Sequence, residues 1–256
     1  MSHADDQIDH LFKRLHLAFM RNHWRDVVER AERGQWAYRD LVGTLASEEV
    51  AHRAQTGVQR RTRAAKFPFI KTLEEFNFSM QSTLRAKMLG SYCGHELVAE
   101  GKGLVLHGRP GRGKTHLAIA IAYKAILNGY DALFTTAAEL IEDLHSAAVD
   151  GRLYERLKRY VAPAVLIVDE VGYLSLPMNA ANVLYHVVNA RYLKHRPIIV
   201  TTNKALTQWG EVLHDQDLAD TIVDRLLERG RLITLDGPSL RNPDGIGEAE
   251  ARGATA

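Results

Sequence analysis

A glycine-rich segment, Gly108 to Thr115, constrains the fold of this chain more than any other part of the sequence. It reads G-R-P-G-R-G-K-T and matches the phosphate-binding pattern G-x-x-x-x-G-K-[ST] at every defined position. The apolar stretch 103–107 before it is predicted as a buried strand, and 115–127 after it as a helix. A strand, such a loop and a helix in this order predict an α/β domain that binds a nucleoside triphosphate.

Chemistry explains the residue types in this loop. Its glycines allow successive backbone N–H groups to point into one anion-sized hollow. Lys114 is predicted to reach the β- and γ-phosphates and to act in catalysis, and the Thr115 hydroxyl to ligate Mg²⁺. Arg109 and Arg112 add charge that faces nucleotide, a neighbouring subunit or solvent. We expect ATP to be held by Gly108, Arg109, Pro110, Gly111, Arg112, Gly113, Lys114, Thr115 and His116.

Two acids, Asp169 and Glu170, come directly after the strand predicted over 164–168. Ligands of open parallel sheets bind where the strands end. Hydrolysis requires an acid that holds Mg²⁺ and a carboxylate that polarises the attacking water. We assign Asp169 to the metal and Glu170 to catalysis as the base.

Polar residues later in the chain are further candidates. Asn203 follows the strand predicted over 197–201, where an amide can orient the attacking water; it is also an ordinary turn residue. Arg225 is assigned to catalysis, because an arginine from a neighbouring subunit can stabilise transition-state charge. Its alternative is a surface pair with Asp224. Arg241 is the last candidate for nucleotide binding.

The N-terminal third is predicted to be helical. Apolar residues at 8, 11, 12, 15 and 19 follow one helix face, and the stripe continues to Gly34. A second helix is predicted over 38–65, and Phe67-Pro68 ends it, because the residue before proline avoids the α region.

From about residue 81 onward, helices and strands alternate, which predicts a parallel sheet. The further strands are expected at 132–135 and 231–235, and the further helices at 137–148, 153–160, 179–193 and 218–228. The predicted fold class is therefore α/β, with a central parallel sheet flanked by helices after a small all-α N-terminal domain. We expect a helical domain over 1–66 that binds DNA or a partner, a linker over 67–80, an ATPase domain over 81–241 and a disordered tail over 242–256.

A basic run without acidic residues extends from Arg53 to Lys71. Such a run can neutralise phosphates, and it is equally typical of a solvated helix face followed by a linker. Four phenylalanines at 67, 69, 76 and 78 follow or overlap it. They either stack on bases or dock the linker on the next domain, and we favour docking.

Composition excludes several classes of protein. The longest apolar run, 161–168, is far shorter than the roughly twenty residues of a membrane span. The first residues carry acids and no apolar stretch, so we expect no secretory signal, and the single cysteine, Cys93, fits a reducing compartment. The expected location is cytoplasmic. Histidines show no H-E-x-x-H spacing, and there is no G-x-S-x-G elbow.

Taken in order, the motifs resemble one family. They are G-R-P-G-R-G-K-T-H-L-A-I-A, F-T-T-A-A-E-L, L-I-V-D-E-V-G-Y-L, T-T-N-K-A-L-T-Q-W-G-E-V, and D-R-L-L-E-R with the following L-D-G-P-S-L-R. Together with K-F-P-F-I-K-T-L-E-E-F they resemble the IstB transposition helpers, which are AAA+ ATPases encoded by insertion sequences beside their transposase. These proteins are related to the DnaC helicase loader.

The resemblance implies roles for matching residues. Lys114 and Thr115 correspond to the Walker A lysine and threonine, and Asp169 and Glu170 to the Walker B acids. It also implies that Asn203 is sensor 1, that Arg225 is a trans-acting arginine finger and that Arg241 is sensor 2. Pro238 and Leu240 replace the acid and tyrosine usual before that last arginine.

The resemblance further implies an AAA+ fold, ATP with Mg²⁺, and a homo-oligomer, ring or helical, that assembles on duplex DNA and stimulates its transposase. It shifts the basic run toward DNA binding by Arg53, Arg60, Arg61, Arg63 and Lys66. Two alternatives stay open: a DnaC-type adaptor that loads a helicase, and a small-molecule kinase that shares the phosphate loop. The kinase would not need the pair Asp169-Glu170.

Overall fold

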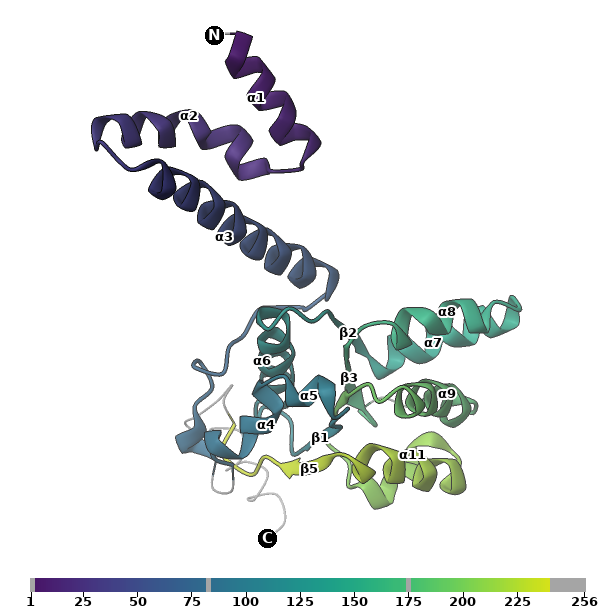
Figure 1. The fold of residues 1–256 in the computed structure, drawn as a ribbon. Coiled ribbons are helices and arrows are strands. Elements are labelled where there is room, and N and C mark those ends of the chain that lie inside the picture. Colours follow the sequence, from purple (N-terminus) through teal and green to yellow (C-terminus); the bar gives the residue numbers. More distant parts are fainter. Residues whose placement is uncertain (1–2, 82–83, 174–175, 240–256) are drawn as a thin grey trace. The chain divides into compact units, whose positions relative to one another are not determined.

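The computed structural model describes residues 3–81, 84–173 and 176–239, and these form two compact units (Figure 1). The first unit ends at Arg60 and the second begins at Arg61. The first contains α1 (His3–Arg14), α2 (Ala18–Arg33) and most of α3 (Tyr38–Ala64). Its small core is formed by Trp24, Val27 and Ala31 of α2.

The prediction of one long helix from residue 8 to Gly34 is wrong, because the structure has two helices there, α1 and α2. His16 adopts a left-handed conformation with φ of 55°. The N–H of Leu17 donates to the Phe12 carbonyl (2.9 Å) and the N–H of His16 to the Lys13 carbonyl (3.1 Å). This is a Schellman helix end in which histidine occupies the position that glycine usually takes. The apolar stripe continues across the break, so periodicity alone does not reveal it.

A buried glutamate, Glu49, organises the N-terminal unit. Its carboxylate accepts hydrogen bonds from the N–H groups of Phe19 (2.9 Å) and Met20 (3.1 Å) at the start of α2. Arg53 donates to the same carboxylate (2.8 Å) and to the carbonyl of His16 (2.8 Å). Burial raises the pKa of Glu49, but these hydrogen bonds outweigh it and lower the pKa below its usual range. Glu49 therefore acts as a charged cap for α2.

The second unit is built on a parallel five-stranded sheet in the order β2-β3-β4-β1-β5. Its strands are β1 (Leu104–His107), β2 (Ala132–Thr136), β3 (Val165–Val171), β4 (Ile198–Thr202) and β5 (Arg231–Thr234). The central strands are mostly apolar and buried on both faces, as expected for a parallel sheet covered on both sides. The predicted fold class is confirmed.

Helices cover both faces of this sheet (Figure 1). On one face α6 (Lys114–Leu127) packs against β1 to β4. On the other, α7 (Ala137–Val149) packs on β2 and β3, and α11 (Gln216–Glu228) on β1 and β5. Between these two lies α9 (Ala180–Leu193), and α8 (Leu153–Val161) packs on α7 and α9.

Several short helices complete the unit and were not predicted individually. They are η1 (Phe78–Met80), η2 (Ala86–Leu89), α4 (Gly90–Cys93), α5 (Glu96–Ala99), η3 (Leu206–Gln208) and α10 (Trp209–Leu213). Trp209 is fully buried, so α10 contributes to the core next to α11. Within the described ranges, no helix combines the length and apolar character needed to cross a membrane.

Candidate nucleotide site

The phosphate loop connects β1 to α6 and has the backbone that its glycines predict. Gly108, Gly111 and Gly113 have φ values of 153°, 79° and 87°, and Gly113 is the residue that precedes α6. A Cβ on Gly108 would lie 2.5 Å from the Leu235 carbonyl oxygen, and one on Gly111 would lie 2.4 Å from the Ser239 hydroxyl. At Gly108 a side chain would meet backbone, and at Gly111 the left-handed φ favours glycine. The following helix, α6, begins with its N-terminal dipole directed at the loop.

The Lys114 ammonium folds back over this loop. It donates to the carbonyl oxygens of Gly108 (2.7 Å) and Arg109 (3.0 Å). Nearby, burial lowers the pKa of His107 at the end of β1, and the charge of Lys114 lowers it further. His107 is consequently neutral at pH 7, which leaves the lysine as the charged group of this pair.

Asp169 lies at the centre of a hydroxyl network. The Thr115 hydroxyl donates to its carboxylate oxygens at 3.0 and 3.1 Å, and the Thr201 hydroxyl donates to the same carboxylate. Asp169 is only 4% exposed. The two predicted metal ligands, Thr115 and Asp169, are therefore adjacent, and Thr201 is a partner that the sequence analysis did not assign. Its only signal in the sequence is a hydroxyl residue near the end of a strand.

Glu170 points to solvent from an irregular position in β3. The strand was predicted to end at Val168 but continues to Val171, so that both acids lie within it. Glu170 has φ of 61°, and the pairing with β4 shifts register between Val168 and Val171. The N–H of Glu170 donates to the Thr201 hydroxyl (2.9 Å). This bulge leaves Asp169 buried and exposes the Glu170 carboxylate.

Asn203 directly follows β4, which is the neighbour of β1 in the sheet. This strand lies beside the phosphate loop, since the N–H of Gly108 donates to the Thr202 carbonyl (3.2 Å). The Asn203 side-chain oxygen is buried and has no hydrogen-bond partner. A buried amide oxygen without a partner is costly and indicates a group that a ligand or water completes.

Most of these residues line one cavity of about 320 Å³, which is large enough for a small ligand. Eight of the predicted residues line it: Pro110, Gly111, Gly113, Lys114, Thr115, His116, Glu170 and Asn203. Phe69, Lys71, Tyr173, Thr201 and Thr202 also line it, although the sequence analysis assigned none of them to nucleotide binding. Its glycine cradle, adjacent Thr115 and Asp169, and unpartnered Asn203 oxygen fit a nucleotide with Mg²⁺.

Gly108, Arg109, Arg112 and Asp169 are not among the residues that line the cavity. Arg109 is exposed, whereas Arg112 is buried and its carbonyl accepts from Gln81 (3.4 Å). The His116 ring lies 3.1 Å from the Thr72 carbonyl and so faces the preceding linker as well as the cavity. Arg241 lies outside the described residues, and its predicted role stays a prediction.

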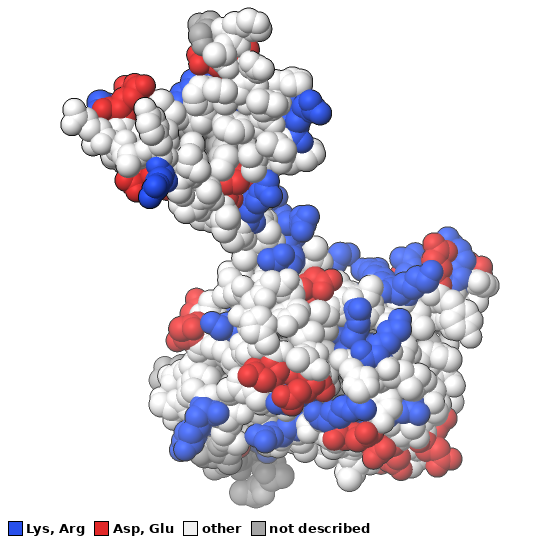
Figure 2. All heavy atoms as spheres, in the orientation of Figure 1, with Lys and Arg blue, Asp and Glu red and all other residues white. Residues whose placement is uncertain are grey.

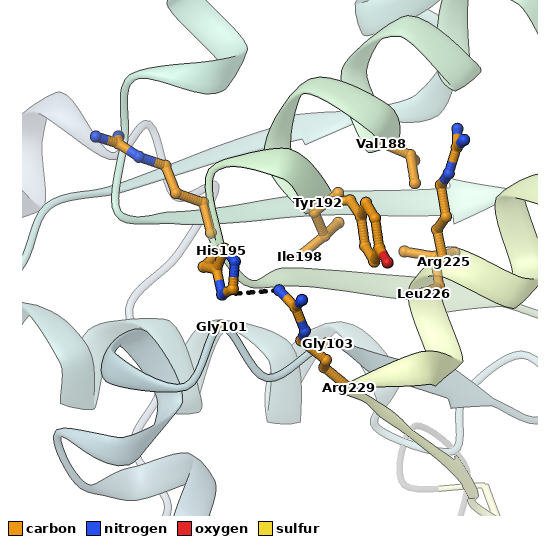
Figure 3. Close-up of a pocket in the computed structure, with 10 residues that line it drawn as sticks. Gly101, Gly103, Val188, Tyr192, His195, Ile198, Arg225, Leu226 and Arg229 are labelled. Carbon is orange, nitrogen blue, oxygen red and sulfur yellow. Dashed lines mark hydrogen bonds between the residues drawn. The ribbon is translucent and has the colours of Figure 1, made fainter.

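Arg225 lies at the end of the sheet where β1 and β4 begin, whereas the phosphate loop follows the end of β1. It lines a small hollow with Gly103, which precedes β1, and Ile198, which begins β4 (Figure 3). Its guanidinium lies over the rings of Tyr185 (4.7 Å to the centroid) and Tyr192 (5.8 Å), and one nitrogen is buried without a hydrogen-bond partner. In the described part of the chain no ion pair with Asp224 is found; the arginine stacks on tyrosines instead.

The basic run lies on α3 and just after it. Figure 2 shows Lys and Arg side chains along the C-terminal part of this helix. Arg60, Arg63 and Lys66 are exposed, whereas Arg61 is half-buried with a side-chain nitrogen that lacks a partner. Arg53 forms an ion pair with Glu49 at the start of α2. A contact between Arg53 and DNA, as predicted, would be a second function of this side chain.

The loop geometry yields a prediction with a matched control. Gly108→Ala is expected to weaken ATP binding at least about tenfold, because the new Cβ meets the backbone carbonyl of Leu235 and displaces the loop. Gly129 also has positive φ (95°), but no atom lies within 4 Å of a Cβ there. Gly129→Ala should thus introduce the same kind of backbone strain, about 1–2 kcal/mol, and leave the affinity for ATP unchanged. Titration with a fluorescent ATP analogue measures both; equal affinities for ATP would refute the clash.

The fold and the site together define a P-loop nucleotide-binding protein with the AAA+ fold: a parallel sheet with the phosphate loop after β1, the acid pair on β3 and a polar residue after β4. Within that class, residues 10–245 match the sequence model described as IstB-like ATP binding protein. The chain belongs to this family of ATP-binding proteins.

Relatives and solved structures agree with this assignment. The chain is 35% identical over 236 residues to a protein described as an ATP-binding protein of insertion sequence IS5376 from Geobacillus stearothermophilus, covering 92% of this chain and 94% of the relative. It is 34% identical over 235 residues to the corresponding protein of insertion sequence IS21 from Pseudomonas aeruginosa, covering 92% and 88%.

Two solved structures share the fold of the second unit. The AMPPCP-bound DnaA of Aquifex aeolicus has a TM-score of 0.57 at 21% identity, and the match covers 73% of this chain and 56% of DnaA. The DnaC helicase loader has a TM-score of 0.50 at 23% identity, covering 69% of this chain and 99% of DnaC.

Proposed function

We propose that this protein is an ATP-hydrolysing, DNA-binding AAA+ ATPase that assembles on duplex DNA and helps the transposase of the same insertion sequence to select its target. The observation that carries the proposal is similarity along nearly the whole chain to ATP-binding proteins of insertion sequences. The nucleotide cavity and the exposed basic residues at the end of α3 support it. A helicase-loader role rests only on the fold shared with DnaC.

In this proposal the chain's own residues bind ATP and position the attacking water. Lys114 exchanges its contacts with the loop carbonyls for the phosphates, and the N-terminus of α6 stabilises their charge. Mg²⁺, held by Thr115 and Asp169, would neutralise charge on the phosphate oxygens. The exposed Glu170 carboxylate accepts a proton from water, and Asn203 orients that water through its amide.

The site is completed by a second copy of the chain. Arg225 lies at the end of the sheet where β1 and β4 begin, whereas the phosphates bind where these strands end. A neighbouring subunit that packs this end of its sheet against the phosphate loop presents its arginine to the nucleotide. Tyr185 and Tyr192 hold its guanidinium at that end of the sheet. Hydrolysis then depends on assembly, which places ATP turnover under the control of DNA.

Mixing two inactive variants tests this arrangement. Arg225→Ala should lower DNA-stimulated turnover at least about tenfold without changing ATP affinity, because it removes the arginine from the next subunit's site. Mixing it with Glu170→Gln should restore part of the turnover, since some interfaces then combine an intact Glu170 with an intact Arg225. Phosphate release with and without duplex DNA is the measurement. A mixture no more active than its components would contradict a shared site.

The partner is tested separately. We expect the protein to retain the transposase encoded beside its gene in a pull-down with ATP and duplex DNA. Retention of the host replicative helicase, and not of the transposase, would favour the helicase-loader alternative.

A further inference from the structure

The segment 66–71, which we call the strap, joins the end of α3 to the ATPase fold and is anchored on both sides. Before it, Ala65 is fully buried and its carbonyl accepts from the N–H of Phe134 in β2 (2.8 Å). After it, the Thr72 carbonyl lies 3.1 Å from the ring nitrogen of His116, in the first turn of α6. The strap therefore runs from the edge strand β2 to the start of α6.

A second contact reinforces the anchor on α6. Phe76 is 3% exposed and packs edge-on against His116, with ring centroids 5.2 Å apart, and against Phe78 at 4.8 Å. This aromatic cluster agrees with the docking interpretation of these phenylalanines. Phe69 differs from them, because it is 45% exposed and lines the nucleotide cavity.

Lys71 brings a positive charge into the same cavity. Its side chain is 42% exposed and lines the cavity together with Lys114, Glu170 and Asn203. The Lys71 ammonium lies 3.8 Å from the Glu75 carboxylate, whose oxygen also accepts from the N–H of Thr72 (3.0 Å). This distant, partly exposed pair contributes little, so the ammonium remains available to a stronger anion.

We propose that Lys71 is a further nucleotide-binding residue, which contacts the triphosphate from the strap and makes the strap respond to the γ-phosphate. The inference rests on the proposed nucleotide site. Lys71 and Lys114 are the lysines among the described residues that line this cavity, and Glu170 and Asn203 line it too. A contact between the Lys71 ammonium and the γ-phosphate favours ATP over ADP, because only ATP carries the third phosphate.

Chemical footprinting of lysines in the full-length protein tests the proposal. Each Nζ is acetylated with a limiting reagent and quantified by mass spectrometry, alone, with ADP and with a non-hydrolysable ATP analogue. We expect the analogue to protect Lys71 at least about threefold more than ADP does, while both protect Lys114 and neither protects the exposed Lys158. Protection of Lys114 without Lys71 would overturn the inference alone. Protection of neither would overturn the proposed nucleotide site as well.

A substitution provides the second arm. Lys71→Met should weaken binding of the ATP analogue about tenfold and of ADP by less than about threefold, whereas Lys71→Arg retains the affinity for both. Lys158→Met, at an exposed position on α8, is the matched control and should change neither. Equal losses for both nucleotides, or no loss for either, would contradict a contact with the γ-phosphate.

Discussion

Glu170→Gln is expected to leave ATP binding intact and to reduce turnover by roughly 10²–10⁴-fold, the usual contribution of a general base. The substitution preserves the size of the side chain and changes neither the phosphate loop nor Lys114. The Glu170 carboxylate is exposed at the cavity, and the hydrogen bond that holds its backbone to Thr201 does not involve the side chain. The loss should therefore fall on the chemical step.

Steady-state phosphate release and titration with a fluorescent ATP analogue separate the two effects. Glu142→Gln, at an exposed position on α7 outside the nucleotide cavity, is the matched control and should behave as wild type. The same experiment distinguishes an ATPase from a small-molecule kinase, because a kinase would not need this acid pair. Turnover within about threefold of wild type would contradict the assignment of Glu170 as the base.

Arg191→Met is expected to cost about 3–5 kcal/mol of unfolding free energy, the largest stability effect that we predict for one substitution. Arg191 lies on α9 and is fully buried. Burial lowers its pKa to about 9, so the side chain is still charged at pH 7. No carboxylate is hydrogen-bonded to it among the described residues; backbone carbonyls surround it instead.

Its guanidinium joins segments that are distant in the sequence. It donates to the carbonyl oxygens of Tyr160, Val161 and Pro163 at 2.8, 3.5 and 2.9 Å. It also donates to those of Ala164 and Pro197 at 2.9 and 2.7 Å. These carbonyls lie just before β3 and β4, the strands that present Asp169 and Asn203. The carbonyls of Val161 and Pro197 also accept from Arg196 (3.1 Å) and from the N–H of Leu166 (3.4 Å). Removing the guanidinium takes away the hydrogen bonds that it donates to the other three buried carbonyls, and a buried acceptor without a partner costs more than the net value of one bond.

Urea denaturation followed by circular dichroism measures the loss. Arg191→Lys keeps the charge but cannot fork between several acceptors, so most of the loss should remain. Lys194→Met, at an exposed position just after α9, controls for charge removal near this helix end and should cost less than about 1 kcal/mol. A loss below about 1 kcal/mol for Arg191→Met would show that solvent or another group satisfies these carbonyls.

Local patterns predicted most of the ATPase fold. The order of strand, loop and helix around Gly108–Thr115 predicts a phosphate site on a parallel sheet, and the apolar run before Asp169 predicts a further strand. Each pattern involves residues that are neighbours in the sequence, so it can be recognised from the sequence alone. The place of Asn203 beside the loop depends on the pairing of β4 with β1, which the local sequence pattern does not determine.

The features that were missed depend on single dihedral angles or on contacts distant in sequence. His16 breaks the N-terminal helix without a glycine or proline to signal it, and Glu170 takes a left-handed conformation inside β3. Lys71 reaches the nucleotide cavity only because the strap is anchored on β2 and α6. The role of Arg191 likewise arises from carbonyls that the fold brings together.

Assembly on DNA is the central claim, and analytical ultracentrifugation of the wild-type protein with duplex DNA tests it most directly. With a non-hydrolysable ATP analogue, several copies should sediment together on the duplex, and electron microscopy should show an ordered ring or helical assembly. With ADP or without nucleotide, we expect no such assembly. A monomer in every nucleotide state, indifferent to DNA, would contradict the claim that ATP governs assembly.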